Sequence, residues 1–137
     1  MSQGAVRAGL DAYTSAFTGA GDVATEGVVY LPKPGVGYLA CRLSGYTRTP
    51  IALGANAAFQ ESGLYQVSVN RPTVEGMKSA GRFADLIVAL FPRATVIALA
   101  TGQVLTIESA SAQPAVPSGD WISIPVVVRW FAIDNGP

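Results

Sequence analysis

The chain has no histidine and a single cysteine, Cys41, among its 137 residues. One cysteine cannot form a disulfide within the chain, and without histidine the usual zinc ligands and the commonest general base are missing. We therefore predict no metal site. The alternation of residues 38–44 places Cys41 on the inner side of a strand, as a small buried hydrophobic residue rather than a reactive thiol.

Charge is also scarce, since 13% of the residues are charged and nine basic residues balance nine acidic ones. No net charge attracts nucleic acid or an anionic membrane. No basic start precedes an apolar core, and no window approaches the ~20 apolar residues of a membrane span, so we expect a protein made in the cytosol. With half of the residues apolar, we expect assembly to cover much of the surface; a small monomer rich in Ala, Gly and Val is the alternative.

Motifs for catalysis or cofactor binding are absent. The sequence has no Walker, dinucleotide-binding or helical metal-binding pattern, and its nine carboxylates are scattered. We predict no catalytic residue, no metal and no cofactor. A small-molecule-binding or enzymatic α+β domain is the alternative from a different class, and carboxylates clustered in a deep pocket would favour it.

The most regular stretch runs from residue 61 to residue 92. Tyr65, Val67 and Val69 alternate with polar residues, which is typical of a half-buried strand. Pro72 should end this strand, and Thr73 should cap a helix that Pro92 terminates. The helix is amphipathic, with one apolar row of Met77, Ala80, Ala84, Ile87 and Phe91.

The remaining pattern predicts a helix over 3–18 and strands over 28–31, 38–44, 95–100, 104–109 and 120–132. Short connections between strands favour a single α+β domain over residues 1–137, with a mostly antiparallel sheet and two helices packed on one face. Because Pro125 has no N–H group, we expect its strand at a sheet edge or at a bulge.

We expect the working surfaces at two places besides the strand of Pro125. Residues 45–62 are too apolar for an idle loop and predict a protruding hairpin or arm that contacts a neighbouring molecule; folding over its own core is the alternative. The other place is the outer face of the central helix, where Arg82 and Asp85 can also form a simple surface pair. The candidate interface residues are Arg48, Ile51, Leu53, Phe59, Lys78, Arg82, Asp85 and Pro125.

The basic residues come from different predicted elements. If Arg42, Arg48, Arg71, Arg82 and Arg93 converge, they could line a channel for DNA; otherwise each is a solvated single charge.

As an ordered set, these features resemble the tail terminator proteins of long-tailed bacteriophages. The resemblance rests on GLYQVSV (63–69), a proline-led turn, the helix VEGMKSAGRFADLIVALFPR (74–93), VLTIESA (104–110) and PSGDWISIPVVVRWFA (117–132). It implies a structural virion protein, not an enzyme, that forms a ring, typically a hexamer. Such a ring caps the tail tube at its head-proximal end after assembly in the host cytoplasm.

The partners implied by the resemblance are further copies of the chain, the tube protein and the head-completion or neck protein. DNA would pass through the lumen without sequence-specific binding, and no membrane is involved. A neck or head–tail joining ring protein, or a tube-like protein that polymerises by itself, are the nearest alternatives.

Overall fold

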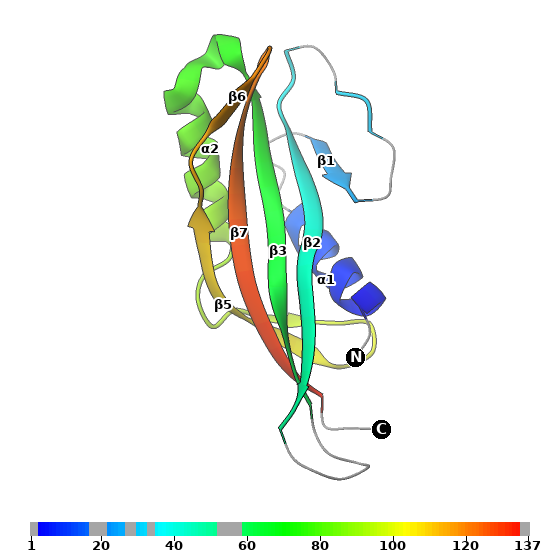
Figure 1. Ribbon diagram of the computed structural model, residues 1–137. Helices are drawn as coiled ribbons and strands as arrows, with labels where there is room; N and C mark the ends of the chain where they lie inside the picture. The colour runs from blue at the N-terminus through cyan, green and yellow to red at the C-terminus, as the bar shows by residue number, and fades with distance from the viewer. Residues whose placement is uncertain (1–2, 17–21, 27–29, 33–34, 52–58, 135–137) are drawn as a thin grey trace.

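The computed structural model of the chain describes residues 3–16, 22–26, 30–32, 35–51 and 59–134. These residues form two α-helices, α1 (Gln3–Ser15) and α2 (Gly76–Leu90), and a 3-10 helix, η1 (Thr73–Glu75). The strands are β1 (Asp22–Thr25), β2 (Tyr38–Pro50), β3 (Phe59–Pro72), β4 (Val96–Ala98), β5 (Val104–Ala112), β6 (Val116–Ser118) and β7 (Trp121–Asp134). Figure 1 shows both helices behind the three long strands β2, β3 and β7.

The strands form one curled sheet in the order β1-β2-β3-β7-β5-β4, with β6 paired to β7 beside β5. Every pair is antiparallel except β1 with β2. The predicted α+β class with a mostly antiparallel sheet is therefore confirmed. No helix in the described ranges is long and apolar enough to cross a membrane.

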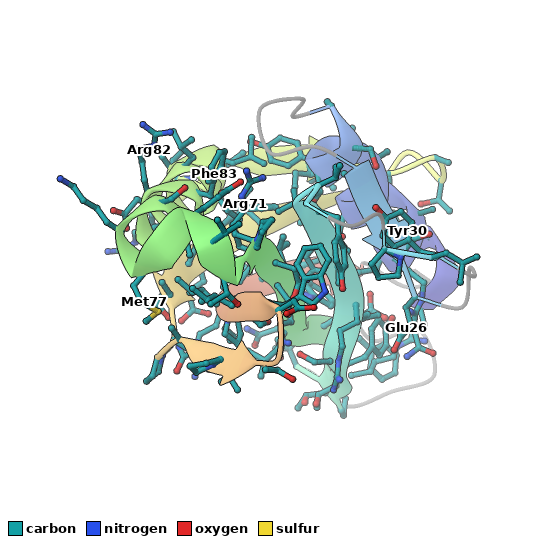
Figure 2. The ribbon with its side chains drawn as sticks, turned by 90° about the horizontal axis from the view of Figure 1, so that it is seen from above. Glu26, Tyr30, Arg71, Met77, Arg82 and Phe83 are labelled. Atoms are coloured by element: carbon teal, nitrogen blue, oxygen red, sulfur yellow. The ribbon has the colours of Figure 1, made fainter. Side chains whose placement is uncertain are left out.

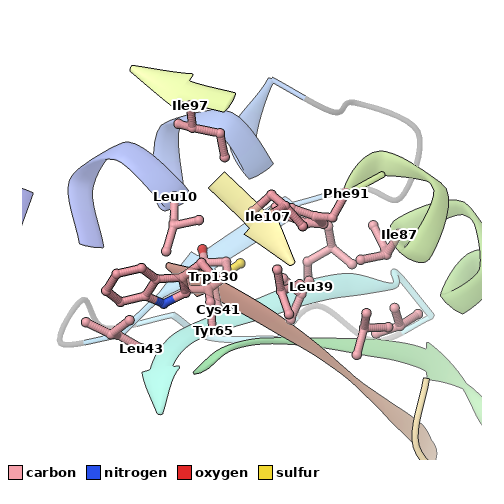
Figure 3. Close-up of a cluster of buried hydrophobic side chains, with 14 of the residues drawn as sticks. Leu10, Leu39, Cys41, Leu43, Tyr65, Ile87, Phe91, Ile97, Ile107 and Trp130 are labelled. Carbon is pink, nitrogen blue, oxygen red and sulfur yellow. The ribbon is translucent and has the colours of Figure 1, made fainter. Parts of the chain in front are cut away.

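Alternation along the long strands gives the sheet two unlike faces. The face toward the helices, called here the helix-covered face, carries the core (Figure 3). Its buried side chains are Leu39, Cys41, Leu43, Tyr65, Val67, Val69, Ile124, Val126, Val128 and Trp130. Burying one such large apolar side chain stabilises the fold by roughly 1.5–3 kcal/mol.

Both helices cover this face with small or aliphatic residues. Val6 and Leu10 of α1 are buried, as are Ala80, Ala84 and Ile87 of α2. The predicted helical periods are thus confirmed. Met77 is the exception in the predicted apolar row of α2. It lies in the first turn of the helix and is 54% exposed.

One predicted strand needs correction, and the described part of residues 45–62 tests the predicted hairpin. The strand predicted over residues 28–31 is wrong in its described part, because residues 30–32 are not strand. Residues 28, 29, 33 and 34 lie outside the described residues. The strand of this region is β1 instead. Residues 45–50 and 59–62 form no loop, because they continue β2 and β3 as an antiparallel hairpin in register from Tyr46 with Gly63 to Pro50 with Phe59. The predicted hairpin is confirmed over these residues.

β2 and β3 approach each other closely where β2 carries an irregularity between Leu43 and Gly45. A Cβ atom on Gly63 would lie 2.1 Å from the carbonyl oxygen of Gly45 and 2.9 Å from a ring atom of Trp130. The position therefore accepts only glycine without a shift of the backbone.

The prediction that Pro125 lies in an edge strand or at a bulge is wrong, because β7 is flanked by β3 on one side and by β5 and β6 on the other. The register of β7 with β3 also runs through Pro125 without a shift. Pro125 lies opposite the break between β5 and β6, and its carbonyl oxygen accepts a hydrogen bond from the amide of Gln113. In an antiparallel strand, the backbone nitrogen and oxygen of one residue point to the same neighbouring strand. The nitrogen of Pro125 therefore faces the break between β5 and β6, where no strand needs its missing N–H.

Thr73 does not cap α2. Its hydroxyl donates to the carbonyl of Gly119, and α2 begins after a 3-10 turn with no side-chain cap. The hydroxyl instead ties the end of β3 to the turn before β7. β3 does end at Pro72, as predicted.

The hairpin predicted around residues 101–103 is confirmed. Gly102 takes a positive φ of 86°, and the amide of Leu99 donates to Gln103.

Candidate interaction surfaces

Three predicted interface residues meet at the end of the β2–β3 hairpin. The guanidinium of Arg48 lies 4.0 Å above the ring of Phe59, and its Nε lies 3.9 Å from Oε1 of Glu61. Ile51 follows β2 and is 53% exposed. Leu53 lies outside the described residues. A cation stacked on an aromatic ring beside an exposed aliphatic residue suits a protein contact.

Glu61 beneath them is a buried carboxylate that the sequence pattern did not single out. Its Oε1 accepts a 2.5 Å hydrogen bond from the hydroxyl of Tyr46. In the described part of the chain, its Oε2 and the Nε1 of the buried Trp130 have no hydrogen-bond partner. The same end of the sheet therefore holds two unsatisfied polar atoms, each of which costs free energy.

The outer face of α2 brings Lys78, Arg82 and Asp85 together, as predicted. They line one shallow hollow with Glu75, Ser79 and Gly81. The prediction of an ion pair between Arg82 and Asp85 is wrong, because no ion pair joins these two described residues. The Arg82 guanidinium instead lies 5.6 Å from the centre of the Phe83 ring. This face therefore offers unpaired charges of both signs.

Arg71 connects β3 to α2 and was missed as a structural residue. It donates two 2.9 Å hydrogen bonds to the carboxylate of Glu75 and stacks 4.0 Å over the ring of Phe83 (Figure 2). Arg71 holds the pKa of Glu75 below its usual value. A Cβ on Gly37 would lie 2.0 Å from this guanidinium, so the arginine is enclosed.

α1 is held to the sheet by polar contacts as well as by its apolar side. The hydroxyl of Tyr65 donates a 2.5 Å hydrogen bond to Asp11, while Arg7 pairs with Glu26 beside β1. Burial raises the pKa of Asp11 despite the Tyr65 hydrogen bond, whereas the hydrogen bond from Arg7 lowers the pKa of Glu26. These contacts fix α1 against the middle of the helix-covered face.

Cys41 is buried on the same face, as predicted. Burial raises the pKa of its thiol to about 11. The thiol is therefore protonated near neutral pH, which disfavours nucleophilic chemistry.

Large apolar side chains are exposed at both ends of the long strands. At the upper end, where β3 ends and β7 begins, Val74 is 91% exposed, and Leu31, next to Pro32 of the groove there, is 80% exposed. Val116 of β6, paired with Ser123, is exposed at the same end. A groove between Pro72, Val74 and Trp121 opens there. At the lower end, Ile51 and Ile133 are exposed. Single exposed residues are ordinary, but a gathering of them marks a contact surface.

Within the described ranges, no group of three or more potential ligand side chains could hold a metal ion. The fold and surfaces define a small α+β structural domain whose exposed features suit contacts with other proteins. The chain matches the profile described as phage tail terminator protein over residues 3–130, and it therefore belongs to the phage tail terminator family.

Solved structures share the fold. One, whose title names no function, is 25% identical and has a TM-score of 0.74, with 96% of each chain covered. Another is titled as the virion of a native gene transfer agent particle; it is 17% identical, with a TM-score of 0.62 over 95% of this chain and 96% of that one. At that identity the likeness shows the fold alone. No curated protein matches the sequence.

Family membership makes the chain a structural component of a phage virion that associates with other tail components. The suspected resemblance to tail terminators is thereby confirmed.

Proposed function

We propose that the chain forms a closed ring, of six subunits, that caps the tail tube at its head-proximal end. The ring ends the polymerisation of the tube and offers its other side to the head-completion or neck protein, while DNA passes through its lumen. Membership of the tail terminator family supports this role.

The observation that carries the proposal is the exposure of apolar side chains at opposite ends of the long strands. Val74 and Leu31 lie at one end, and Ile51 and Ile133 lie at the other. A protein that caps a tube must contact the tube on one side and a different partner on the other. Apolar side chains at two opposite ends match that requirement, because each end can be covered on assembly.

The sides of the subunit then remain for contacts between neighbouring copies. Head-to-tail contacts close into a ring only if two different surfaces meet at a fixed rotation. The outer face of α2, with Lys78, Arg82 and Asp85 in one hollow, supplies one such surface. We assign the hairpin end with Arg48 and Phe59 to the contact with the partner at the lower end of the strands.

The experiment uses tails assembled without this protein. Purified chain is added, and negative-stain images locate it while native mass spectrometry counts subunits. We expect a six-fold ring on the last tube layer. Tubes formed by the chain alone, or rings seated only on the portal-side adaptor, would contradict the proposal and favour a tube or neck protein.

Two variants test the two ends of the long strands separately, and each is the control for the other. Val74→Asp places a charge at the upper end and Ile51→Asp at the lower end. Each should weaken binding of one partner by at least about tenfold and leave the other partner's binding unchanged. Equal losses with both partners would contradict the assignment of one partner to each end.

A further inference from the structure

A head-to-tail ring needs a second surface on each subunit that fits the outer face of α2. The two surfaces of such a contact differ from each other and lie on different sides of the subunit. A surface with matching charges lies beside β1, on the side of the sheet turned away from the helices. There Glu26 and Arg42 line a shallow groove together with Tyr38 and polar side chains of β3.

Glu26 and Arg42 are neighbours across the first two strands of the sheet. Thr25 is in register with Cys41, and the amide of Glu26 donates to the carbonyl of Cys41, so the next residues of the two strands lie side by side. Neighbouring strands are about 4.8 Å apart. Both side chains are exposed, and in the described part of the chain no ion pair joins them. The groove therefore presents a negative and a positive charge next to each other.

Both charges of the groove can accept a partner from outside the subunit. Arg7 of α1 binds Glu26 at Oε1, yet 44% of the Glu26 side chain stays exposed. A carboxylate accepts hydrogen bonds at both of its oxygens, so a second cation can bind there. Among the described residues, Arg42 takes part in no ion pair.

The outer face of α2 presents the same two kinds of charge at nearly the same spacing. Arg82 and Asp85 are exposed and lie three residues apart, which places their Cβ atoms about 5–6 Å from each other. Lys78 adds a second cation one helical turn before Arg82. Glu75 lines the same hollow, but its carboxylate is held by Arg71. The charges left for a partner are thus two cations and one anion.

The outer face of α2 and the groove beside β1 lie on opposite sides of the subunit. Figure 2 shows Arg82 at one side of the molecule and Glu26 at the other, with the sheet between them. A contact between these two surfaces therefore leaves one of each kind free for a further copy.

The same separation answers the question of an arginine-lined channel. The predicted set does not converge within the subunit, because Arg82 lies on α2 and Arg42 lies in the groove beside β1. The members of that set are Arg42, Arg48, Arg71, Arg82 and Arg93.

We infer that the outer face of α2 of one copy binds the groove beside β1 of the next copy, an inference that rests on the proposed ring. Arg82 then faces Glu26 of the neighbouring copy, and Asp85 faces its Arg42. Each charge meets its opposite, whereas a half-turn of one surface brings like charges together. Exposed pairs add little affinity, but their complementarity fixes the register of a contact. A fixed register sets one rotation between neighbours, which a closed ring requires.

Pairing of two α2 faces about a two-fold axis is the competing arrangement. Arg82 of one copy would then meet Asp85 of the other, and the product would be a dimer. The groove beside β1 favours the head-to-tail contact, because it offers the complementary pair of charges on the side of the subunit that α2 does not cover.

Glu108 and Arg129 are another exposed pair of unlike charges, but they lie beside α2 of their own subunit. Glu108 is the extra residue at the irregularity of β5, opposite Arg129 of β7. Both of these strands contact α2. Replacing Glu108 is therefore the matched control for replacing Glu26, because it removes the same charge from an exposed position outside the inferred contact.

The first test is cross-linking through introduced cysteines, for which the chain is suited because its own Cys41 is buried. A short bis-maleimide reagent is added in solution at high protein concentration and on tails assembled without this protein. Glu26→Cys/Arg82→Cys should give a covalent ladder of two and more copies on a denaturing gel. Arg82→Cys alone should stay single, and a mixture of the two single variants should stop at dimers. The control Glu108→Cys/Arg82→Cys should give no ladder.

The second test reverses charges across the contact and measures association by sedimentation velocity. Asp85→Arg brings a positive charge to Arg42 of the neighbour, and Arg42→Asp brings a negative charge to its Asp85. Each variant should weaken association by at least about tenfold. The double variant Asp85→Arg/Arg42→Asp restores opposite charges and should recover association to within about threefold of the wild type.

Three results would overturn the inference: cross-linked dimers of Arg82→Cys alone, a ladder from the Glu108→Cys control equal to that of the Glu26→Cys variant, or no recovery in the charge-swapped double variant. A six-fold ring on tails without cross-linking between residues 26 and 82 would remove the inferred contact and leave the proposed function standing. A ladder through these residues on copies that never cap a tube would do the reverse. Copies that stay single both in solution and on tails would contradict both.

Discussion

The helix-covered face of the sheet and the opposite face, called here the open face, are built from alternate residues of the same strands, yet they differ in which substitutions they tolerate. Tyr65 and Trp130 are fully buried on the first, while their neighbours Gln66 and Arg129 lie on the second. The covered face is constrained by volume and by enclosed hydrogen bonds, because its partner is the chain itself. The open face is not covered by the helices, so it carries polar side chains such as Gln66 and Arg129 beside half-buried apolar ones such as Phe131.

The largest expected effect on stability comes from comparing two consecutive residues of β7 that lie on opposite faces of the sheet. Trp130→Ala should lower the free energy of unfolding by about 3–5 kcal/mol, because it leaves a cavity in the core. Phe131→Ala, on the half-exposed side of the same strand, should cost at most about 1 kcal/mol. Urea unfolding of both variants measures the difference, and similar values would break the comparison of the two faces.

The enclosed guanidinium of Arg71, at the rim of the helix-covered face, should tolerate added volume nearly as poorly as the core does. Gly37→Ala directs a methyl group into the Arg71 guanidinium, which is held by Glu75 and Phe83. We expect a loss of about 1–3 kcal/mol in unfolding free energy. In an Arg71→Ala background the same change should cost little.

Gly81→Ala is the control for this substitution. No atom lies within 4 Å of a Cβ at that position of α2, so the change should stabilise the protein by about 0.5–1 kcal/mol. An undiminished cost of Gly37→Ala in the Arg71→Ala background would show that the guanidinium is not the cause.

The smallest expected effect is on the pH dependence of stability, where Asp11 and Glu75 should act with opposite signs. The folded state raises the pKa of Asp11 above 3.8, so it binds that proton more tightly than the unfolded chain. The contribution of Asp11 to stability therefore falls as pH rises from about 3.8 through the folded pKa. Urea unfolding from pH 3 to pH 7 should show the wild type losing stability relative to Asp11→Asn across that window.

Glu75 should behave in the opposite way, because Arg71 lowers its pKa below 4.5. Its contribution is present above pH 4.5 and is lost as pH falls through the folded pKa. The stability difference between wild type and Glu75→Gln should thus increase with pH. Two differences of the same sign would refute the assigned pKa directions.

Periodicity predicted much of the fold because it reports burial directly. The alternation around Tyr65 and the spacing of Ala80, Ala84 and Ile87 both proved to mark the core. Gly9 of α1 shows where periodicity stops: a Cβ there would meet the side chain of Leu99 at 2.4 Å, which is a tertiary reason for glycine that the sequence does not show.

The candidate surfaces were predicted less completely. Lys78, Arg82 and Asp85 share a hollow because helical spacing alone places them on one face. The roles of Arg71 and Glu61 were missed, since their partners Phe83 and Tyr46 come from other segments. Pro125 misled for the same reason, because only the break between β5 and β6 makes a central proline acceptable.

The sequence by itself determined the class of the fold, the core positions of the central strand and helix, and the resemblance to the tail terminators. Those properties depend on local spacing and on ordered motifs. Only the tertiary structure decided which strand is central and which arginine is enclosed. Strand order and register bring together residues far apart in the chain, and no local pattern encodes that pairing.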